Sequence, residues 1–372
     1  MWVLKILFLI HDLGQGGAEK VLVNLVNNMD QDKFDVTVMT LFDVGVNRQF
    51  LAPHITYKSC FSKAIPGNSK LMKLLTPQQL HRRLIKDHYD IEVSYLEGPS
   101  ARVISGCPDQ NTKLVCWIHI EQRTREVAAS SFRSAAEAEN CYNRFNQIIA
   151  VSETVKEDFA SLLKIHVPVE VLYNTNETGK ILRLAQESVE KEMFSAKRIN
   201  IVGVGKLLKN KGFDRLARIG KRLLNEGYPI HIYILGIGPE QEALERYARE
   251  NNMADQFTLL GYQTNPYKYV ARCDLFVCSS FREGFSTATT EALIVGTPVC
   301  TVEVSGMREM LGNSEYGLIT ENSEEALYQG IKKLLDEPKL LKHYREQARI
   351  RGRFFSKEKT VRAVEEMLLN AL

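Results

Sequence analysis

Apolar runs without strict alternation recur along the whole chain, and segments with helical periodicity separate them. In the first half the runs are VLKILFLI, FDVTVMTLF, DIEVSYL, KLVCWIHI, NQIIAVS and VEVLYN. In the second half they are RINIVGVG, IHIYILG, FTLLG, DLFVCSS and PVCTVEV. Strands that are apolar on both faces and alternate with helices are typical of parallel sheets covered by helices on both sides. The pattern therefore predicts a doubly wound α/β protein.

The alternation pauses once, in a polar and charged stretch between Thr175 and Lys197. The chain has 372 residues, which is more than one hydrophobic core normally supports. We therefore expect two α/β domains, residues 1–178 and residues 179–354, with a ligand site in the cleft where they meet. The tail from Pro338 onward predicts helices only. We expect the last helix, about 355–372, to pack back on the N-terminal domain.

Composition narrows the class of protein. A formal net charge of +3 with 25% charged residues gives no overall electrostatic reason to expect nucleic acid as a partner. The seven cysteines are scattered without C-x-x-C spacing and lie mostly in apolar runs, which predicts buried reduced thiols of a cytosolic protein rather than disulfides or zinc sites. The N-terminal stretch MWVLKILFLIHDLG is too short to span a bilayer, so we expect it to be the first core strand.

Glycine turns follow the first strand of each predicted domain, where parallel sheets bind ligands. The stretch HDLGQGGAEK, with Gly16 and Gly17, leads into a helix whose free N–H groups can approach a phosphate. A plain tight turn explains these glycines equally well. The dinucleotide-binding spacing fails because Glu19 stands at the third glycine position, which disfavours a nicotinamide-dependent oxidoreductase.

Lysines gather after the first strand of the second domain, in GVGKLLKNKGFDRL. This is not a P-loop, because Leu207 follows the first lysine where Ser or Thr is required. Loop lysines are usually only solvated, but at this edge Lys206 and Lys211 are candidates to hold a diphosphate. Gly236 ends a later strand, and backbone near Tyr262 follows another, where it could contact a planar base.

Two further features are candidates for catalysis. His119 ends the strand KLVCWIHI at the carboxyl edge, where a structural role and a functional role are equally open. Asp30 and Asp32 form a D-x-D pair, but they lie at the amino edge of the first sheet, and we expect a turn there. No carboxylate or histidine cluster has convincing ligand spacing, so we expect no catalytic metal ion.

The stretch REGFSTATTEALIVGTPV separates two carboxylates by seven residues. The Gly-Thr-Pro at 296–298 ends a helix that should begin at about Ser286 and run to about Val295. Glu283 then lies in the loop before the helix, near its free amide groups, and Glu291 lies within a helix that is otherwise small and apolar.

Residues 61–86 carry six basic residues and no acidic residue, interleaved with leucines; we name them the basic segment. Such a pattern suits the surface of an anionic membrane. A helix that packs on the core and keeps a solvated basic face is an equally good interpretation.

Taken together, the motifs resemble those of the retaining nucleotide-sugar glycosyltransferases of family 4, which have the GT-B fold. The most specific motif is the Glu, seven residues, Glu pattern, present as EGFSTATTE. It is accompanied in order by HDLGQGGAEKVLVNL, IIAVSETV, VLYNTNE, VGVGKLLKNKGFDRL, LGIGPEQEALE, GTPV and GMREML. The resemblance covers nearly the whole chain and implies two Rossmann-like domains that face each other across a cleft.

The resemblance also implies roles for individual residues. Glu283 would contact hydroxyls of the donor sugar, and Glu291 would hold the ribose of the nucleotide. Lys206 and Lys211 would bind the diphosphate, although Lys206 stands where the family more often has Arg. His119 matches the family's strand-end histidine. The full set of expected site residues is Glu283, His119, Lys206 and Lys211 for catalysis, and Gly16, Gly17, Gly205, Gly236, Tyr262, Gly284, Phe285, Ser286, Thr287 and Glu291 for donor binding.

We accordingly expect a retaining transferase that moves a hexose or N-acetylhexosamine from a nucleotide sugar, UDP-linked, to a saccharide or lipid-linked acceptor in bacterial surface-glycan synthesis. The expected enzyme needs no cofactor and is cytoplasmic, or peripheral on the inner face of the membrane if the basic segment binds anionic lipid. The alternatives are a sugar-nucleotide epimerase of similar fold and a catalytically inactive member that only binds nucleotide sugar.

Overall fold

The computed structural model describes residues 3–63, 72–190, 193–194 and 197–372 and divides into two compact units. The first unit comprises Met1–Thr175 together with Glu358–Leu372, and the second comprises Asn176–Lys357. The chain therefore passes between units at residues 175–176 and 357–358, beside the boundaries of 178 and 354 predicted from the sequence. The C-terminal residues belong to the first unit.

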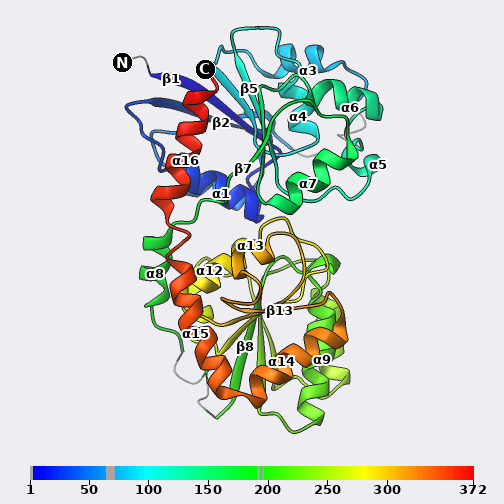
Figure 1. Ribbon diagram of the computed structural model, residues 1–372, viewed down its shortest axis with the longest axis vertical. Helices are drawn as coiled ribbons and strands as arrows, with labels where there is room; N and C mark the ends of the chain where they lie inside the picture. Colours follow the sequence, from blue (N-terminus) through cyan, green and yellow to red (C-terminus); the bar gives the residue numbers. More distant parts are fainter. Residues whose placement is uncertain (1–2, 64–71, 191–192, 195–196) are drawn as a thin grey trace. The chain divides into compact units, whose positions relative to one another are not determined.

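Among the described residues, the first unit contains a parallel sheet of seven strands in the order β3-β2-β1-β4-β5-β6-β7. The strands are β1 (Leu4–Ile10), β2 (Phe34–Phe42), β3 (Thr56–Phe61), β4 (Ile91–Ser94), β5 (Lys113–Ile118), β6 (Gln147–Ala150) and β7 (Val169–Val171). Helices lie on both faces of the sheet (Figure 1). They are α1 (Gly17–Val26), η1 (Val46–Phe50), α3 (Pro77–Leu84), α4 (Pro99–Ile104), α5 (Arg125–Ala128), α6 (Ala135–Tyr142), α7 (Glu153–Leu162) and α16 (Lys357–Asn370).

The second unit repeats this architecture with a parallel sheet of six strands in the order β10-β9-β8-β11-β12-β13. The strands are β8 (Ile199–Val204), β9 (Ile230–Leu235), β10 (Phe257–Gly261), β11 (Leu275–Cys278), β12 (Val299–Val302) and β13 (Leu318–Thr320). The helices are α8 (Thr178–Ala185), η2 (Lys209–Lys211), α9 (Phe213–Asn225), α10 (Gln241–Glu250), α11 (Tyr267–Val270), α12 (Thr287–Val295), α13 (Met307–Leu311), α14 (Glu324–Asp336) and α15 (Pro338–Gly352).

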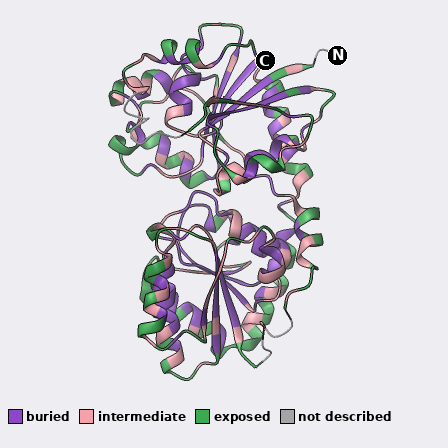
Figure 2. Cartoon of the chain, turned by 180° about the vertical axis from the view of Figure 1, so that it is seen from behind, coloured by how far each residue is buried: buried purple, intermediate pink, exposed green. Residues whose placement is uncertain are grey.

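The apolar runs of the sequence form the cores of the two units. The central strands of both sheets are buried, whereas the helices expose their outer faces (Figure 2). In β1, Ile6 through Ile10 are fully buried, as expected for a strand covered on both faces. The predicted parallel α/β architecture is therefore confirmed. None of the described helices is both long and apolar enough to cross a lipid bilayer.

Two strands were not predicted, and the basic segment does not form one continuous helix. β3 has no buried residue, and β13 has only three residues, all half-exposed, so neither produces a conspicuous apolar run. The basic segment begins at the end of β3 and includes α3, which a Thr76 capping box starts. Residues 64–71 of the segment, including Lys70, lie outside the described part of the chain.

Candidate active site

In the second unit, the turn that follows β8 packs directly against the loop that follows β11. Gly212 has a φ of 64°, and a Cβ atom at this position would lie 2.0 Å from the carbonyl oxygen of Ser279. Only glycine allows both this backbone conformation and this close approach. The hydroxyl of Ser279 in turn donates to the carbonyl oxygen of Lys211 across 2.9 Å. Two strand-end loops that are distant in sequence are thereby joined at the carboxyl edge of the sheet.

This packing brings Lys211 into contact with Glu283. The Lys211 ammonium donates to Glu283 Oε1 across 2.6 Å, and the hydroxyl of Ser280 donates to the same oxygen across 2.6 Å. The Glu283 side chain is only 10% exposed. Burial alone would lower the pKa of Lys211, but the neighbouring carboxylate of Glu283 outweighs it and raises the pKa above its ordinary value. Lys211 therefore carries a full positive charge at neutral pH.

A buried arginine that the sequence analysis did not single out supports this loop. Arg215 on α9 is 1% exposed and donates to the carbonyl oxygens of Ser279 (2.7 Å) and Ser280 (2.9 Å). Its remaining nitrogen donates to Asn322 Oδ1 across 2.9 Å. An arginine in an amphipathic helix is usually a surface residue, so its sequence position carries no signal of this role. The planar guanidinium fixes the backbone immediately before Glu283.

Glu291 lies on α12, as predicted from the helix-stop signal. The helix begins after Ser286, whose side chain accepts from the backbone N–H of Thr289, and ends at Gly296 in the left-handed conformation. Glu291 is 6% exposed, and the hydroxyl of Tyr267 lies 3.3 Å from its Oε1. Like Arg215, Tyr267 was not predicted from the sequence; it contacts Glu291.

The residues predicted to bind the donor at the start of α12 and after β10 differ in how far they are buried. Gly284 and Phe285 connect Glu283 to the helix, and the buried Phe285 ring packs edge-on against Phe355, with ring centroids 6.1 Å apart. Thr287 is the first residue of α12. Tyr262 directly follows β10, and its side chain is 39% exposed. The loop is thus anchored by an apolar contact, while Tyr262 remains accessible.

The glycines after β8 and β9 pack against each other. Gly236 has a φ of 146°, and a Cβ atom there would lie 1.9 Å from the carbonyl oxygen of Gly205. The aliphatic chain of Lys211 passes within ordinary contact distance of Gly205, at 3.7 Å from where a Cβ would stand. Gly236 is therefore needed for backbone packing, whereas a Cβ atom at Gly205 would make only ordinary contacts with its neighbours. Lys206 is half-buried and forms no ion pair with another described residue.

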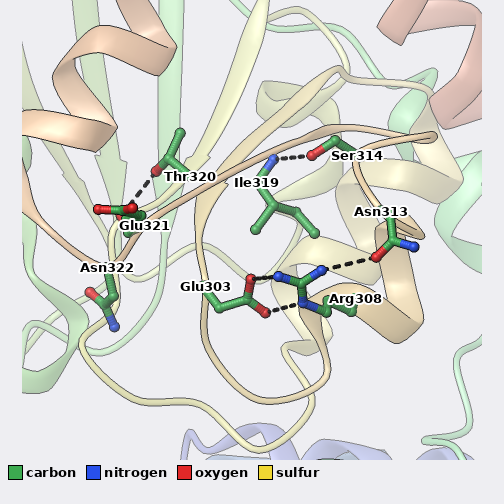
Figure 3. Close-up of a pocket in the computed structure, with 8 residues that line it drawn as sticks. All are labelled: Glu303, Arg308, Asn313, Ser314, Ile319, Thr320, Glu321 and Asn322. Carbon is green, nitrogen blue, oxygen red and sulfur yellow. Dashed lines mark hydrogen bonds and ion pairs between the residues drawn. The ribbon is translucent and has the colours of Figure 1, made fainter.

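A polar pocket opens beside these loops, at the carboxyl ends of β12 and β13 (Figure 3). The guanidinium of Arg308 donates to both carboxylate oxygens of Glu303, at 2.8 and 2.6 Å, and to Asn313 Oδ1 at 2.9 Å. Asn322, which contacts Arg215, also lines the pocket. Because Glu303 neutralises Arg308, this pocket offers an anion less attraction than Lys206 does, which has no such partner among the described residues.

The predicted residues of the first unit form no comparable cluster. Gly16 is the N-cap of α1 and Gly17 is its first residue. The carboxylate of Glu19 lies over Gly16, where a Cβ atom would approach Glu19 Oε2 to 1.9 Å. A phosphate at this helix end would therefore compete with Glu19. The expected turn at Asp30 is present, and this carboxylate pairs with Lys33 across 2.8 Å.

His119 follows β5 at the carboxyl edge of the first sheet. Its backbone N–H donates to Glu97 Oε2 across 2.9 Å, and its ring packs on Tyr95 with centroids 5.0 Å apart. Its Nε2 is fully buried and has no hydrogen-bond partner among the described residues. Burial lowers the pKa of His119 to about 3, while a hydrogen bond with the Tyr95 backbone opposes this effect in part. His119 is therefore neutral near pH 7, and its Nε2 is enclosed by the protein.

Models of known protein families match most of the chain. Residues 15–178 match the family model Glycosyltransferase Family 4, and residues 185–351 match the family model Glycosyl transferases group 1. The chain is 30% identical to the N-acetylgalactosamine-N,N'-diacetylbacillosaminyl-diphospho-undecaprenol 4-alpha-N-acetylgalactosaminyltransferase of Campylobacter jejuni, over 98% of this chain and 99% of that protein.

Solved structures share the fold at lower identity. HepE from Anabaena, in complex with UDP-glucose, superposes with a TM-score of 0.76 and 18% identity, over 99% of this chain and all of that one. Sucrose-phosphate synthase from Thermosynechococcus elongatus gives 0.80 and 17%, over 99% and 98% of the two chains. The two Rossmann-like units are those of a GT-B fold. The chain belongs to the group 1 glycosyl transferases and is a glycosyltransferase.

Proposed function

We propose that the protein transfers a hexose or N-acetylhexosamine from a UDP-sugar to a hydroxyl group of a lipid-linked saccharide, with retention of the anomeric configuration and without a catalytic metal ion. The observation that carries this proposal is the contact between Lys211 and Glu283 at the carboxyl edge of the second sheet. This contact joins the charged Lys211 to the carboxylate of Glu283, which lies just before the N-terminus of α12. Glu291 lies within that helix.

Each of these groups has a task that its chemistry suits. Glu291 accepts hydrogen bonds from the ribose hydroxyls, since a buried carboxylate favours two neighbouring donors. Glu283 accepts from hydroxyls of the donor sugar and holds its ring in position. Lys206, Lys211 and the free amides of α12 attract the diphosphate, which carries negative charge on its oxygens.

The reaction needs only these groups and the two substrates. The bond between the anomeric carbon and the diphosphate oxygen breaks, and the acceptor hydroxyl forms its new bond on the same face of the sugar. The acceptor proton passes to an oxygen of the departing diphosphate. Lys206 and Lys211 stabilise the negative charge that develops there. Stabilisation of developing charge by preorganised groups is usually the largest single contribution to the rate of such a step. Glu283 positions the sugar and forms no covalent bond to it.

The identity of the substrates is inferred from relatives. HepE binds UDP-glucose, and the Campylobacter relative acts on a saccharide carried by diphospho-undecaprenol. We extend the UDP-sugar and the lipid-linked acceptor to this chain, in bacterial surface-glycan synthesis. The exposed basic residues of α3 suit an enzyme that works in the cytoplasm on the inner face of an anionic membrane.

The test is a panel of UDP-sugars given to the purified full chain without added Mg²⁺ or Mn²⁺. UDP release should depend on an undecaprenyl-diphosphate-linked saccharide, and NMR of the product should show the anomeric configuration of the donor. An epimerised sugar nucleotide formed without acceptor would instead identify an epimerase. Tight UDP-sugar binding with no turnover on lipid-linked or soluble acceptors would identify an inactive member, and an absolute need for Mg²⁺ would contradict the metal-free route.

A further inference from the structure

Three side chains that can bind a metal ion meet inside the first unit, away from the residues discussed above. They are His81 on α3, Glu92 on β4 and Cys107, which follows α4. The His81 Nε2 lies 2.8 Å from Glu92 Oε2 and 3.0 Å from Glu92 Oε1. The Cys107 Sγ lies 3.9 Å from Glu92 Oε1. All three residues are buried, with exposed fractions of 6% or less. We name them the His-Glu-Cys cluster.

The topology explains why these residues meet. Glu92 is the second residue of β4, while His81 and Cys107 lie at or just beyond the C-terminal ends of helices, so all three belong to the amino edge of the first sheet. Gly106 allows the end of α4 to touch α3, because a Cβ atom there would lie 1.9 Å from the carbonyl oxygen of Pro77. That close approach sets Cys107 beside His81.

The location excludes two other roles for the cluster. Ligands of parallel sheets bind at the carboxyl edge, so the cluster at the amino edge is not part of the proposed transfer site. Cys107 is 2% exposed, which leaves no access for a substrate and excludes a nucleophilic thiol activated by His81. A group that acts here must be small enough to be enclosed.

We propose that the His-Glu-Cys cluster binds one zinc ion that has a structural role. A nitrogen, a sulfur and a carboxylate oxygen form a mixed ligand set that suits Zn²⁺ and not Mg²⁺ or Ca²⁺. The candidate ligand atoms all lie within 4.8 Å of one another. A tetrahedral zinc ion with bonds of about 2.0 to 2.3 Å holds its ligand atoms roughly 3.3 to 3.8 Å apart, so small side-chain rotations suffice. If both carboxylate oxygens of Glu92 bind, the site is a distorted tetrahedron, because the two oxygens of one carboxylate lie closer together than two tetrahedral positions.

The ion would link three consecutive elements of the chain at one point inside the first unit. It would join the basic helix α3 to a central strand and to the end of α4. Without metal, the same residues form an ion pair: burial by itself lowers the pKa of His81, but hydrogen bonds with Cys107 and Glu92 outweigh it and raise the pKa to about 9. In the zinc-bound state the Cys107 thiolate contacts the metal ion, and in the metal-free state it does not.

The decisive experiment uses Zn²⁺ and Co²⁺ as probes on the full chain. One equivalent of Zn²⁺ should bind in competition with a chromophoric chelator and raise the melting temperature, and Co²⁺ should give a thiolate-to-cobalt charge-transfer band. Cys107→Ser and His81→Gln should each weaken Zn²⁺ binding by at least about 100-fold, because each removes a ligand. Cys60→Ser, which alters the half-buried thiol of β3, should change neither probe.

X-ray absorption of the unmutated, zinc-loaded chain makes the test independent of how well the variants fold. One sulfur neighbour and two or three nitrogen or oxygen neighbours are expected. A chain that fails to retain an equivalent of Zn²⁺ against the chelator, a spectrum without sulfur, or a cobalt thiolate band that survives in Cys107→Ser would each overturn the proposal and leave a metal-free ion pair.

Discussion

Lys211 and Glu283 are joined by a hydrogen bond of 2.6 Å although 72 positions separate them in the sequence. The pair combines a cation suited to the leaving diphosphate with a carboxylate suited to the donor sugar. Because the carboxylate also fixes the ammonium, the position of the positive charge depends on Glu283 as well as on the turn that carries Lys211.

Lys211→Gln should lower turnover by about 100-fold, since it removes one preorganised charge from the departing diphosphate. Binding of the free nucleoside should change little, because the nucleoside has no phosphate to contact. Steady-state rates and nucleoside affinity, measured together, check this. Lys209→Gln is the matched control, an exposed lysine of the same short helix η2. Equal losses for both variants would contradict a specific role for Lys211.

Glu291→Ala should weaken UDP binding by about 1 to 3 kcal/mol, or about 5- to 150-fold, because the ribose hydroxyls lose their acceptor in a largely buried position. Calorimetric titration with UDP gives the affinity, and thermal unfolding gives the stability. Tyr267→Phe, which removes only the hydroxyl near Glu291, should have a smaller effect on affinity. Unchanged UDP affinity in a folded Glu291→Ala variant would remove this residue from the site.

Arg215→Lys should destabilise the second unit by about 2 to 3 kcal/mol, because an ammonium cannot reproduce the hydrogen bonds that the guanidinium makes to Ser279, Ser280 and Asn322. Turnover should fall as well, since the loop before Glu283 loses its support, whereas KM for the donor should change less than kcat. Arg218→Lys on the exposed face of α9 is the control. Denaturant unfolding and kinetics of both variants decide whether Arg215 positions the loop.

The second unit should become less stable as the pH falls from about 6.5 towards 4. Burial lowers the pKa of His231 to about 4, and Arg198 adds to this shift, whereas an unfolded histidine has a pKa of about 6.5. Over this window the unfolded state binds a proton that the folded state does not, which destabilises the fold by about 1 kcal/mol per pH unit.

Urea unfolding of His231→Gln across the same pH range measures this contribution. The variant should lose less stability on acidification than the parent, whereas His343→Gln, which changes an exposed histidine of the same unit, should behave like the parent. Parallel pH profiles for His231→Gln and the parent would contradict the assignment.

The basic segment should bind anionic membranes through α3. Arg82 and Arg83 are exposed on this helix. The nearby Leu74 is 74% exposed, and Arg133 donates a hydrogen bond to the Leu74 carbonyl oxygen across 2.9 Å. Each basic residue near an anionic surface contributes about 1 kcal/mol, so Arg82→Gln with Arg83→Gln should weaken binding about 10- to 30-fold.

Co-sedimentation with phosphatidylglycerol vesicles checks this, and binding should fall as salt rises. The control is Arg123→Gln with Arg125→Gln, two exposed arginines elsewhere in the first unit. Equal binding by the two double variants, or no binding by the parent at low salt, would mean that α3 is an ordinary solvated helix.

Hydrophobic periodicity was sufficient to predict the long buried strands, because a strand covered on both faces must be apolar at nearly every position. It failed for β3, none of whose residues is buried, and for β13, which has three half-exposed residues. Such strands are held by hydrogen bonds to their neighbours, and that pairing leaves little mark on composition. Helix α12 could be predicted almost to the residue because Gly296 and Pro298 stop it locally.

The sequence by itself determined the α/β class, the two-domain organisation and the candidates Lys211, Glu283 and Glu291, because strand ends and helix stops are local signals. Only the tertiary structure decided which groups meet. Arg215 contacts a carbonyl 64 positions away, and the His-Glu-Cys cluster unites three separate elements. These contacts depend on which face of a helix is buried and on where one glycine lets two backbones touch. Both conditions arise from packing between separate elements, and no local pattern of residues encodes them.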